Sequence, residues 1–426
     1  MSWKEPKIPV ADSDHFETLN GLWKGKKEPF AEAGVIRNTN FTPSGMIDYS
    51  NVAYLDVEEK QLAKRRLEAG DIILERSGGG PKQPVGRVVF FDRKDGKFSF
   101  SNFTSAVRVK DKKTFDPRFI FYGLMELYQS GRTEDLQRRT TGIRNLDFTA
   151  YKERARFPKI PLPEQKKIAH ILSTVQRAIE AQERIIHTTT ELKKALMHKL
   201  FTEGLRNEPQ KQTEIGPVPE SWEVAKVGDF AKIQSGGTPA RDVAENWIDG
   251  TIPWVKTGEI DYCVIKDTEE KITSVGLSNS AARLYPEGTL LMAMYGQGIT
   301  RGRVGLLGIE AATNQACASI SPIDVRKLTS LFLYYYFQYH YENLRKLGHG
   351  ANQRNMNAAL IRSFPISFPD ADEQSAVVSA LESLDAKSEL YSRKRNKLQD
   401  LFRTLLHELM TAKTRINGIK LSLGAS

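Results

Sequence analysis

Two short polar segments carry the side chains best suited to hydrogen bonding with a ligand. The first, residues 76–82 (RSGGGPK), is a glycine-rich loop flanked by two cations. Glycine lets a backbone approach a partner closely, and exposed backbone amides can also bind phosphate. The second, residues 138–145 (RRTTGIRN), is a basic loop rich in hydrogen-bonding groups. Both segments favour an anionic partner.

Each of these segments has a counterpart later in the chain. Residues 295–298 (YGQG) stand where residues 77–80 (SGGG) stood, at an offset of 296 − 78 = 218, and residues 350–356 (GANQRNM) match residues 142–146 (GIRNL). The landmarks agree, whereas most residues between them differ. Two copies of one fold with different surfaces suggest one task performed with two specificities.

The charge balance also indicates an anionic partner. The chain has 62 Lys and Arg against 52 Asp and Glu, which gives a net charge of +10. DNA or RNA is the usual reason for such an excess, although solvated helices carry one too. Cys263 and Cys317 are the only cysteines, too few for a disulfide framework or a thiolate metal site. With no signal-peptide core and no run of about 20 apolar residues, we expect a cytoplasmic protein.

Short apolar runs between turn signals predict strands in residues 1–156, at 34–36, 52–55, 71–74, 86–91 and 106–109. A helix is predicted from Pro117 to Tyr128. Residues 205–363 hold a polar, proline-containing linker and a second module with the same order of landmarks. In that module, Gly302-Arg303-Val304 repeats Gly86-Arg87-Val88, and an aromatic helix is expected at 331–341.

Residues 157–204 and 364–412 predict two long helices. Three prolines, at 158, 161 and 163, place the first helix start after Pro163, and Gly204 supplies the stop. Apolar residues recur at steps of three and four, the pattern of a heptad seam, with polar Gln182 and Thr189 on it. The predicted seam residues are Ile168, Ile171, Val175, Ile185, Leu192, Leu196, Val377, Leu381, Leu384, Leu398, Leu405 and Leu409.

The two long helices are copies of each other. Glu164-Gln165 returns as Glu373-Gln374, an offset of 373 − 164 = 209, so the chain is module, helix, module, helix. Such a chain can close into a pseudo-two-fold ring if the helices run antiparallel. The tail, residues 413–426, would then meet the N-terminus. Trp3 would be the counterpart of Trp222, which opens the second module.

The two FP…P…EQ helices, the doubled glycine-loop modules and residues 215–222 (IGPVPESW) resemble the specificity subunit of a Type I restriction-modification system, over essentially the whole chain. The resemblance implies an α+β fold with two target recognition domains, each reading one half of a split DNA sequence. It also implies that the helices pair as an antiparallel coiled coil. By the same resemblance, the partners are double-stranded DNA, two methyltransferase subunits and restriction subunits.

Bases are read by side chains with donors or acceptors at the groove edges, such as Arg to guanine and Asn or Gln to adenine. Two modules on a stiff rod would meet half-sites about one helical turn, ~34 Å, apart. Residue type and loop position select the DNA-binding candidates of the first module: Arg76, Ser77, Gly78, Gly79, Lys82, Gln83, Arg139, Arg144 and Asn145. The candidates of the second module are Thr238, Arg241, Tyr295, Gln297, Arg301, Asn352, Gln353 and Arg354.

Other interpretations of these features stay open. The glycines at 78–80 can form only a hairpin turn, and Arg138 with Arg139 can lie on a solvated face or contact phosphate. The tyrosines from 334 to 341 can simply pack a helix against a sheet, and the heptad helices can serve a coiled-coil scaffold whose modules bind proteins.

Sequence motifs of catalysis are missing. No stretch matches a P-loop, an Asn/Asp-Pro-Pro-aromatic motif, HExxH, a CxxC pair or G-x-S-x-G. The histidines on the long helices have no metal-ligand spacing. We therefore expect a non-catalytic subunit without a cofactor or metal of its own, with S-adenosylmethionine on the partner methyltransferase. A hidden nuclease or methyltransferase is the remaining alternative.

Overall fold

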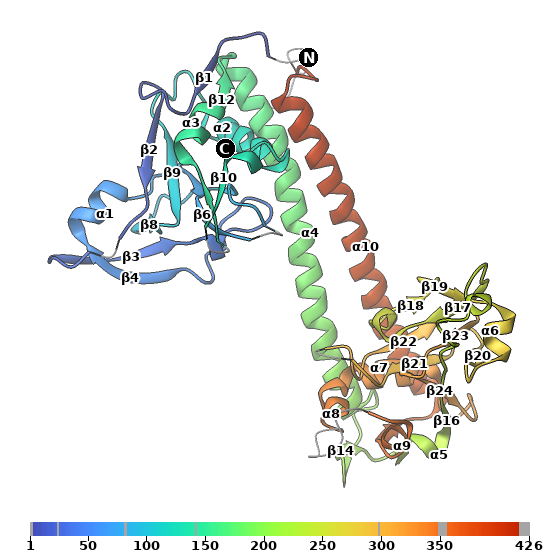
Figure 1. Cartoon of the computed structure of the whole chain (residues 1–426). Coiled ribbons are helices and arrows are strands. Elements are labelled where there is room, and N and C mark those ends of the chain that lie inside the picture. Colours follow the sequence, from blue (N-terminus) through green and yellow to red (C-terminus); the bar gives the residue numbers. More distant parts are fainter. Residues whose placement is uncertain are drawn as a thin grey trace. The chain divides into compact units, whose positions relative to one another are not determined.

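The computed structural model describes residues 3–23, 25–80, 83–140, 143–296, 299–347 and 356–416 (Figure 1). The chain divides into two compact units. Unit 1 comprises Met1–Glu183 with Arg393–Ser426, and unit 2 comprises Arg184–Ser392. The divisions fall inside the two long helices. Half of each helix packs with each module, so each unit combines a module with two half-helices.

Two sheets form most of the first module. The four-stranded sheet has the order β2-β9-β5-β7, with every neighbouring pair antiparallel, and the other sheet has the order β4-β3-β8. These strands confirm the five predicted runs. Their bounds are β2 Phe16–Asn20, β3 Phe30–Ile36, β4 Ala53–Glu58, β5 Ile72–Glu75, β7 Val88–Phe90, β8 Phe98–Phe100 and β9 Thr104–Val109.

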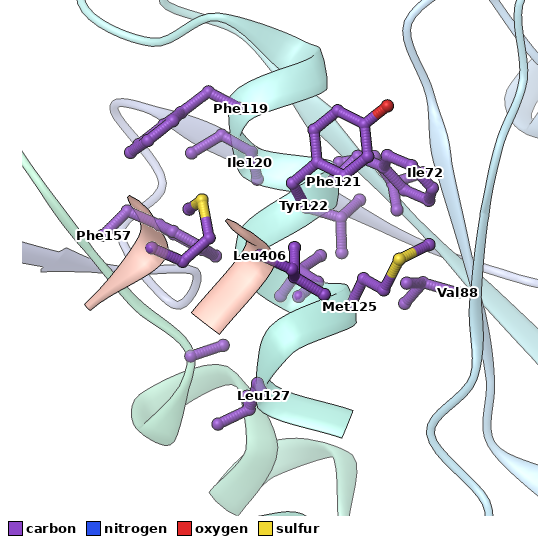
Figure 2. Packing of buried hydrophobic residues seen from close by; sticks show 14 of the residues in the cluster. Ile72, Val88, Phe119, Ile120, Phe121, Tyr122, Met125, Leu127, Phe157 and Leu406 are labelled. Atoms are coloured by element: carbon purple, nitrogen blue, oxygen red, sulfur yellow. The ribbon is translucent and has the colours of Figure 1, made fainter. Parts of the chain in front are cut away.

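Helix α2 (Pro117–Gln129) joins the four-stranded sheet to the long helices of unit 1. Its first turn is capped by Asp116, whose side chain accepts a hydrogen bond from the Phe119 amide. Figure 2 shows Phe121 and Met125 of α2 in one apolar cluster with Ile72 of β5, Val88 of β7 and Leu406 of the second long helix. A single core therefore fixes the sheet, α2 and the long helices together.

The second module repeats this plan. Its strands β16, β24, β21 and β22 stand in the order of β2, β9, β5 and β7, with β18 added at the edge, and a second sheet has the order β19-β17-β23-β20. The bounds are β16 Ala231–Ser235, β17 Ile252–Val255, β18 Val264–Ile265, β19 Glu270–Ile272, β20 Leu284–Tyr285, β21 Leu290–Ala293, β22 Val304–Leu307, β23 Ala311–Thr313 and β24 Cys317–Pro322.

Helix α7 (Ser330–Tyr339) takes the place of α2 in unit 2. It ends two residues before the predicted Tyr341, which begins the short helix α8 (Tyr341–Lys346). Tyr334, Tyr335 and Tyr336 are at most 7% exposed and lie in the core of unit 2. These three tyrosines therefore pack the helix against the sheet and are not available to stack on a ligand.

A short strand at the start of each module pairs with a strand at the end of that module. Strand β1 (Lys7–Pro9) pairs antiparallel with β12 (Arg156–Pro158), and β15 (Glu223–Lys226) pairs antiparallel with β25 (Pro365–Phe368). Each opening strand follows a buried tryptophan, Trp3 or Trp222. Trp3 is thus the counterpart of Trp222. Other short helices and strands of the chain are α1 Glu59–Arg65, α3 Phe148–Arg154, β13 Gln210–Thr213, β14 Gly216–Pro219, α5 Val227–Phe230, α6 Ser274–Ser278 and α9 Ala358–Arg362.

The long helices are α4 (Leu162–Glu203) and α10 (Ala371–Met410). The prediction that the first begins after Pro163 is wrong. It begins at Leu162 because a proline in the first turn needs no intrahelical donor and has a suitable backbone angle. The predicted stop is confirmed, since Gly204 has a φ of +68°, a left-handed conformation that favours glycine.

The two helices pair antiparallel within each unit. In unit 1 the first half of α4 packs with the last half of α10, and in unit 2 the last half of α4 packs with the first half of α10. The buried residues of these contacts are Ile168, Leu172 and Ile179 with Phe402, Leu406 and Leu409 in unit 1, and Met197, Leu200 and Phe201 with Val377 and Leu381 in unit 2.

Most of the predicted seam lies inward. Ile171, Val175, Leu398 and Leu405 pack partly buried against the core of unit 1, Leu196 does so in unit 2, and Ile185 and Leu384 are half-buried. The prediction that Leu192 lies on the seam is wrong, since this residue is 53% exposed. A straight α-helix drifts by about 20° per heptad, so a strict repeat leaves the interface. Thr189 and Met197 are the buried residues on either side of it.

The repeated Glu-Gln pair ties the start of each long helix to its module. Gln165 is fully buried; its amide donates to the carbonyls of Thr114 and Ile160, and its oxygen accepts from the Asp116 amide. Gln374 makes the same three bonds with Lys327, Pro369 and Thr329. These partners are backbone atoms, and the Thr329 hydroxyl adds a 3.5 Å bond to the Gln374 side-chain oxygen. Asp116 and Thr329 are the N-caps of α2 and α7.

The glutamate of each pair meets an arginine that follows the other long helix. Arg415 forms two hydrogen bonds of 3.0 Å with Glu164, stacks 4.6 Å over Trp3 and bonds Glu5. The Trp3 indole donates to the Met410 carbonyl at 2.8 Å. Arg206 pairs likewise with Glu373 at 3.3 Å. The prediction that the segment after Met410 meets the N-terminus is confirmed.

Replacing Gln165 with Ala is expected to lower the free energy of unfolding of unit 1 by about 3 kcal/mol. The change removes three hydrogen bonds and leaves buried backbone groups without partners, each at a cost of about 1–3 kcal/mol. Urea denaturation with a probe in each unit measures the loss. Gln374→Ala is the mirror control, which should weaken unit 2 instead. An effect of either variant on the wrong unit alone would contradict this assignment.

Candidate nucleic-acid interface

The two polar segments of unit 1 form one small sheet. Strand β6 (Ser77–Gly79) pairs with β11 (Ile143–Leu146), and β11 pairs with β10 (Gln137–Thr140). In this register Asn145 lies opposite Ser77 and Arg144 lies opposite Gly79. Both segments are predicted as loops, and that is wrong where strands form, at residues 77–79 of the first segment and at 138–140 and 143–145 of the second. The strands nevertheless bring the two segments side by side.

The side chains of this sheet hold one another in place. The Ser77 hydroxyl bonds the Asn145 side-chain oxygen, and the Asn38 amide donates to the Ser77 carbonyl. Gly78 has a φ of +98°, and a Cβ there would lie 3.0 Å from the Asn38 amide nitrogen. Gly78 therefore allows the chain to bend tightly over Asn38. Arg144 reaches Gln137 at 3.4 Å.

The glycine segment continues into a hairpin. Gly80 and Gln83 exchange two backbone hydrogen bonds of 3.0 and 3.2 Å, which places Gln83 on the exposed return of the turn. A hairpin at these glycines is therefore compatible with an edge that is exposed to a ligand. Lys82, and the side chain of Arg139, lie outside the described part of the chain.

Arg76 is half-buried. Its guanidinium donates to the side chains of Asn20 at 2.9 Å and Ser105 at 3.3 Å, and it lies 4.8 Å from the Phe148 ring. Burial lowers the pKa of this guanidinium. Two of its contacts are neutral oxygens, so its positive charge remains available to a ligand.

Arg76 lies at the side of a groove of about 1050 Å³ in unit 1. Other residues that line this groove are Asn20, Trp23, Asn102, Arg138 and Lys152. Arg138 is 76% exposed and pairs with Asp147. Trp23 is 67% exposed, an unusual state for so large an apolar side chain. Sequence reasoning missed Trp23, although its place in the basic stretch 23–27 (WKGKK) was a usable signal.

Unit 2 repeats the backbone arrangement of the interface, which we call the frame. In unit 1 the amide of Leu146 donates to the Arg76 carbonyl at 2.8 Å, and in unit 2 the amide of Met356 donates to the Met294 carbonyl at 3.3 Å. Gly296, like Gly78, has a positive φ. Tyr295 therefore stands at the position of Ser77, and it is 39% exposed.

The other candidates of unit 2 separate into three groups. Thr238 bonds the side chain of Gln315, and Arg301 donates to the Arg345 carbonyl at 2.9 Å. Gln297, Asn352, Gln353 and Arg354 lie outside the described residues. Arg241 pairs with Glu270 and lies 3.9 Å from the Trp247 ring, so the structure gives it a packing role.

The pKa of Glu270 shows how firmly this arginine is held. Hydrogen bonds from Arg241 first, and then from Lys256, lower the pKa of the Glu270 carboxyl. The tryptophan beneath Arg241 adds a cation–π contact. The charge of Arg241 is thus matched inside its own unit by an acid, with an aromatic ring beside it.

Within the described residues, no three His, Cys, Asp or Glu side chains gather as a metal-binding group would require. A search of the same residues finds no helix with the length and hydropathy to cross a membrane.

Comparison with known proteins places these features in one family. A family model described as "Type I restriction modification DNA specificity domain" matches residues 14–188 and again residues 219–400. A Methanocaldococcus jannaschii protein assigned as the specificity subunit of type I restriction enzyme MjaX is 24% identical over 87% of this chain and 84% of its own. The MjaVIII specificity subunit from the same organism is 26% identical over 74% of this chain and 75% of its own.

A solved structure has the same fold. The crystal structure of the S subunit of a type I restriction-modification system from M. genitalium superimposes with a TM-score of 0.62 at 16% identity, over 96% of both chains. The predicted architecture of two mixed α/β modules alternating with two long helices is confirmed.

Proposed function

Because the chain belongs to the Type I restriction modification DNA specificity domain family, we propose that it reads a split DNA target, one half with each unit. One observation carries the proposal. The same backbone frame occurs twice and presents different residues at its reading edge, as Ser77 and Tyr295 illustrate. Two equivalent frames with different side chains suit two half-sites of different sequence.

The proposed partners are two methyltransferase subunits and, in a complete system, restriction subunits. Leu192, Leu390 and Leu401 of the long helices are between 46% and 60% exposed, and a partner subunit on the helices would cover them. We assign methyl transfer and S-adenosylmethionine to the methyltransferase, with no catalytic role or cofactor on this chain. The two half-sites are expected about one helical turn, ~34 Å, apart.

The proposal is tested by methylation with separated components. Duplex DNA and S-adenosylmethionine are incubated with this chain alone, with the methyltransferase alone and with both. We expect methyl transfer to a split sequence only from the mixture. Transfer by this chain alone would contradict the non-catalytic assignment, and a mixture that modifies a short continuous sequence would contradict reading by two units.

Binding of the complex to duplex DNA is expected to depend steeply on salt. If the complex contacts about six phosphates or more, its affinity falls about a thousandfold or more between ~50 and ~200 mM salt, because counterions are released on binding. Titration of a fluorescent duplex at four salt concentrations gives the slope. Arg138→Ala should make the slope shallower by about one ion if Arg138 contacts phosphate. Arg93→Ala, which removes a partly exposed arginine outside the groove, is the control.

A further inference from the structure

Units 1 and 2 share a glycine that fixes the backbone next to the interface. A Cβ at Gly21 would lie 1.8 Å from the Ser101 carbonyl oxygen, and a Cβ at Gly236 would lie 2.0 Å from the Thr313 carbonyl oxygen. No other residue fits at either place without movement of the backbone. Gly21 directly follows β2, and Gly236 directly follows the equivalent strand β16.

The side chain two residues later differs between the units. In unit 1 it is Trp23, which is 67% exposed. In unit 2 it is Thr238, whose hydroxyl bonds Gln315. A fixed backbone that carries different side chains is the arrangement expected of a position that sets specificity. Thr238 was a candidate from sequence, and its structural counterpart is Trp23.

The surroundings of Trp23 suit DNA. The groove beside it is lined by three cations, Arg76, Arg138 and Lys152, and by the two carboxylates Asp147 and Glu153, of which Asp147 pairs with Arg138. Lys26 and Lys27, which follow Trp23 in the chain, are exposed. Basic groups that can neutralise phosphates, with one amphipathic aromatic ring among them, match the chemistry of a nucleic-acid contact.

We propose that Trp23 makes an apolar contact with a base pair in the half-site read by unit 1, and that the groove beside it takes the adjoining phosphates. The proposal rests on the proposed function of the chain and adds a residue and a surface to it. An indole on the groove wall can pack against the edge of a base, such as the methyl group of a thymine, while Arg76 and Lys152 bind the phosphates of the DNA backbone.

The test uses the complex of the full chain with its methyltransferase. The duplexes carry the sequence that the complex methylates, and in a series of variants each base pair of both half-sites is changed in turn. For Trp23→Ala we expect a tenfold to hundredfold loss of affinity for the unchanged target, the range found when an aromatic contact to a base is removed. Discrimination should disappear at one position of one half-site and persist throughout the other half-site.

Two further variants keep the test decisive. Tyr54→Ala removes another exposed aromatic residue of unit 1, which is 58% exposed and does not line the groove, and it should bind like the wild type. Trp23→Phe should keep part of the discrimination that Trp23→Ala loses. Because Trp23 is exposed, both of its variants should keep the thermal stability of the parent chain.

Each outcome decides between the inference and the proposed function. If Trp23→Ala binds every duplex as the wild type does, the inference is wrong and the reading of a split target stands. If Trp23→Ala fails to assemble with the methyltransferase, the groove contacts protein and the inference is overturned. If the wild-type complex discriminates among none of the duplexes, the proposed function fails, and the inference fails with it.

Discussion

Replacing Leu381 with Asp is expected to unfold unit 2, with a loss in the free energy of unfolding of more than about 4 kcal/mol. Leu381 is fully buried in the core that joins α10, α4 and the second module. The change removes a large apolar side chain and places a carboxylate in an apolar core, and both effects are costly. Urea denaturation of the isolated chain measures the loss.

Leu390→Asp is the matched control. It introduces the same charge in place of the same residue type on the same helix, but Leu390 is 60% exposed. We expect a change within about 0.5 kcal/mol. Similar losses from the two variants would contradict the assignment of the inner and outer faces of α10.

Exchanging residues 10–155 for the corresponding segment of a related chain is expected to change one half of the DNA target and leave the other half intact. Several contacts between the module and α4 do not depend on the exchanged side chains. Gln165 holds the module through backbone atoms of Thr114 and Asp116, and Gln176 holds it through the Ser44 carbonyl. Backbone partners survive a change of side chains.

Mapping of methylated sequences before and after the exchange measures this effect. The parent chain and an exchange of the equivalent segment of unit 2 are the controls, and the second exchange should change the opposite half. A change in both halves after either exchange would contradict independent reading by the two units.

The architecture could be predicted because the sequence carries it locally. The heptad pattern, the repeated Glu-Gln pair and the order of glycine landmarks each arise from short stretches, and all reappear in the structure. The role of Trp3 followed from the symmetry of the repeat, because the second copy places Trp222 in the same position. The prediction for Leu192 failed because an α-helix has 3.6 residues per turn, whereas a heptad repeat assumes about 3.5, and the difference accumulates along the helix.

The candidate interface was less predictable because its contacts are not local. Strand β6 pairs with a strand more than 60 residues away, and alternating apolar residues do not mark either partner. Arg241 was proposed as a DNA contact from its type, and only the structure reveals Glu270 and Trp247 beside it. Trp23 was overlooked because a lone tryptophan is usually part of a core.

The most direct test of the account is the map of methylated bases in DNA from cells that express this chain with its methyltransferase. We expect one split, asymmetric sequence, with a modified base on each strand and unspecified bases between the halves. A continuous sequence would mean that only one unit reads DNA. No new methylation from an assembled complex would contradict the account.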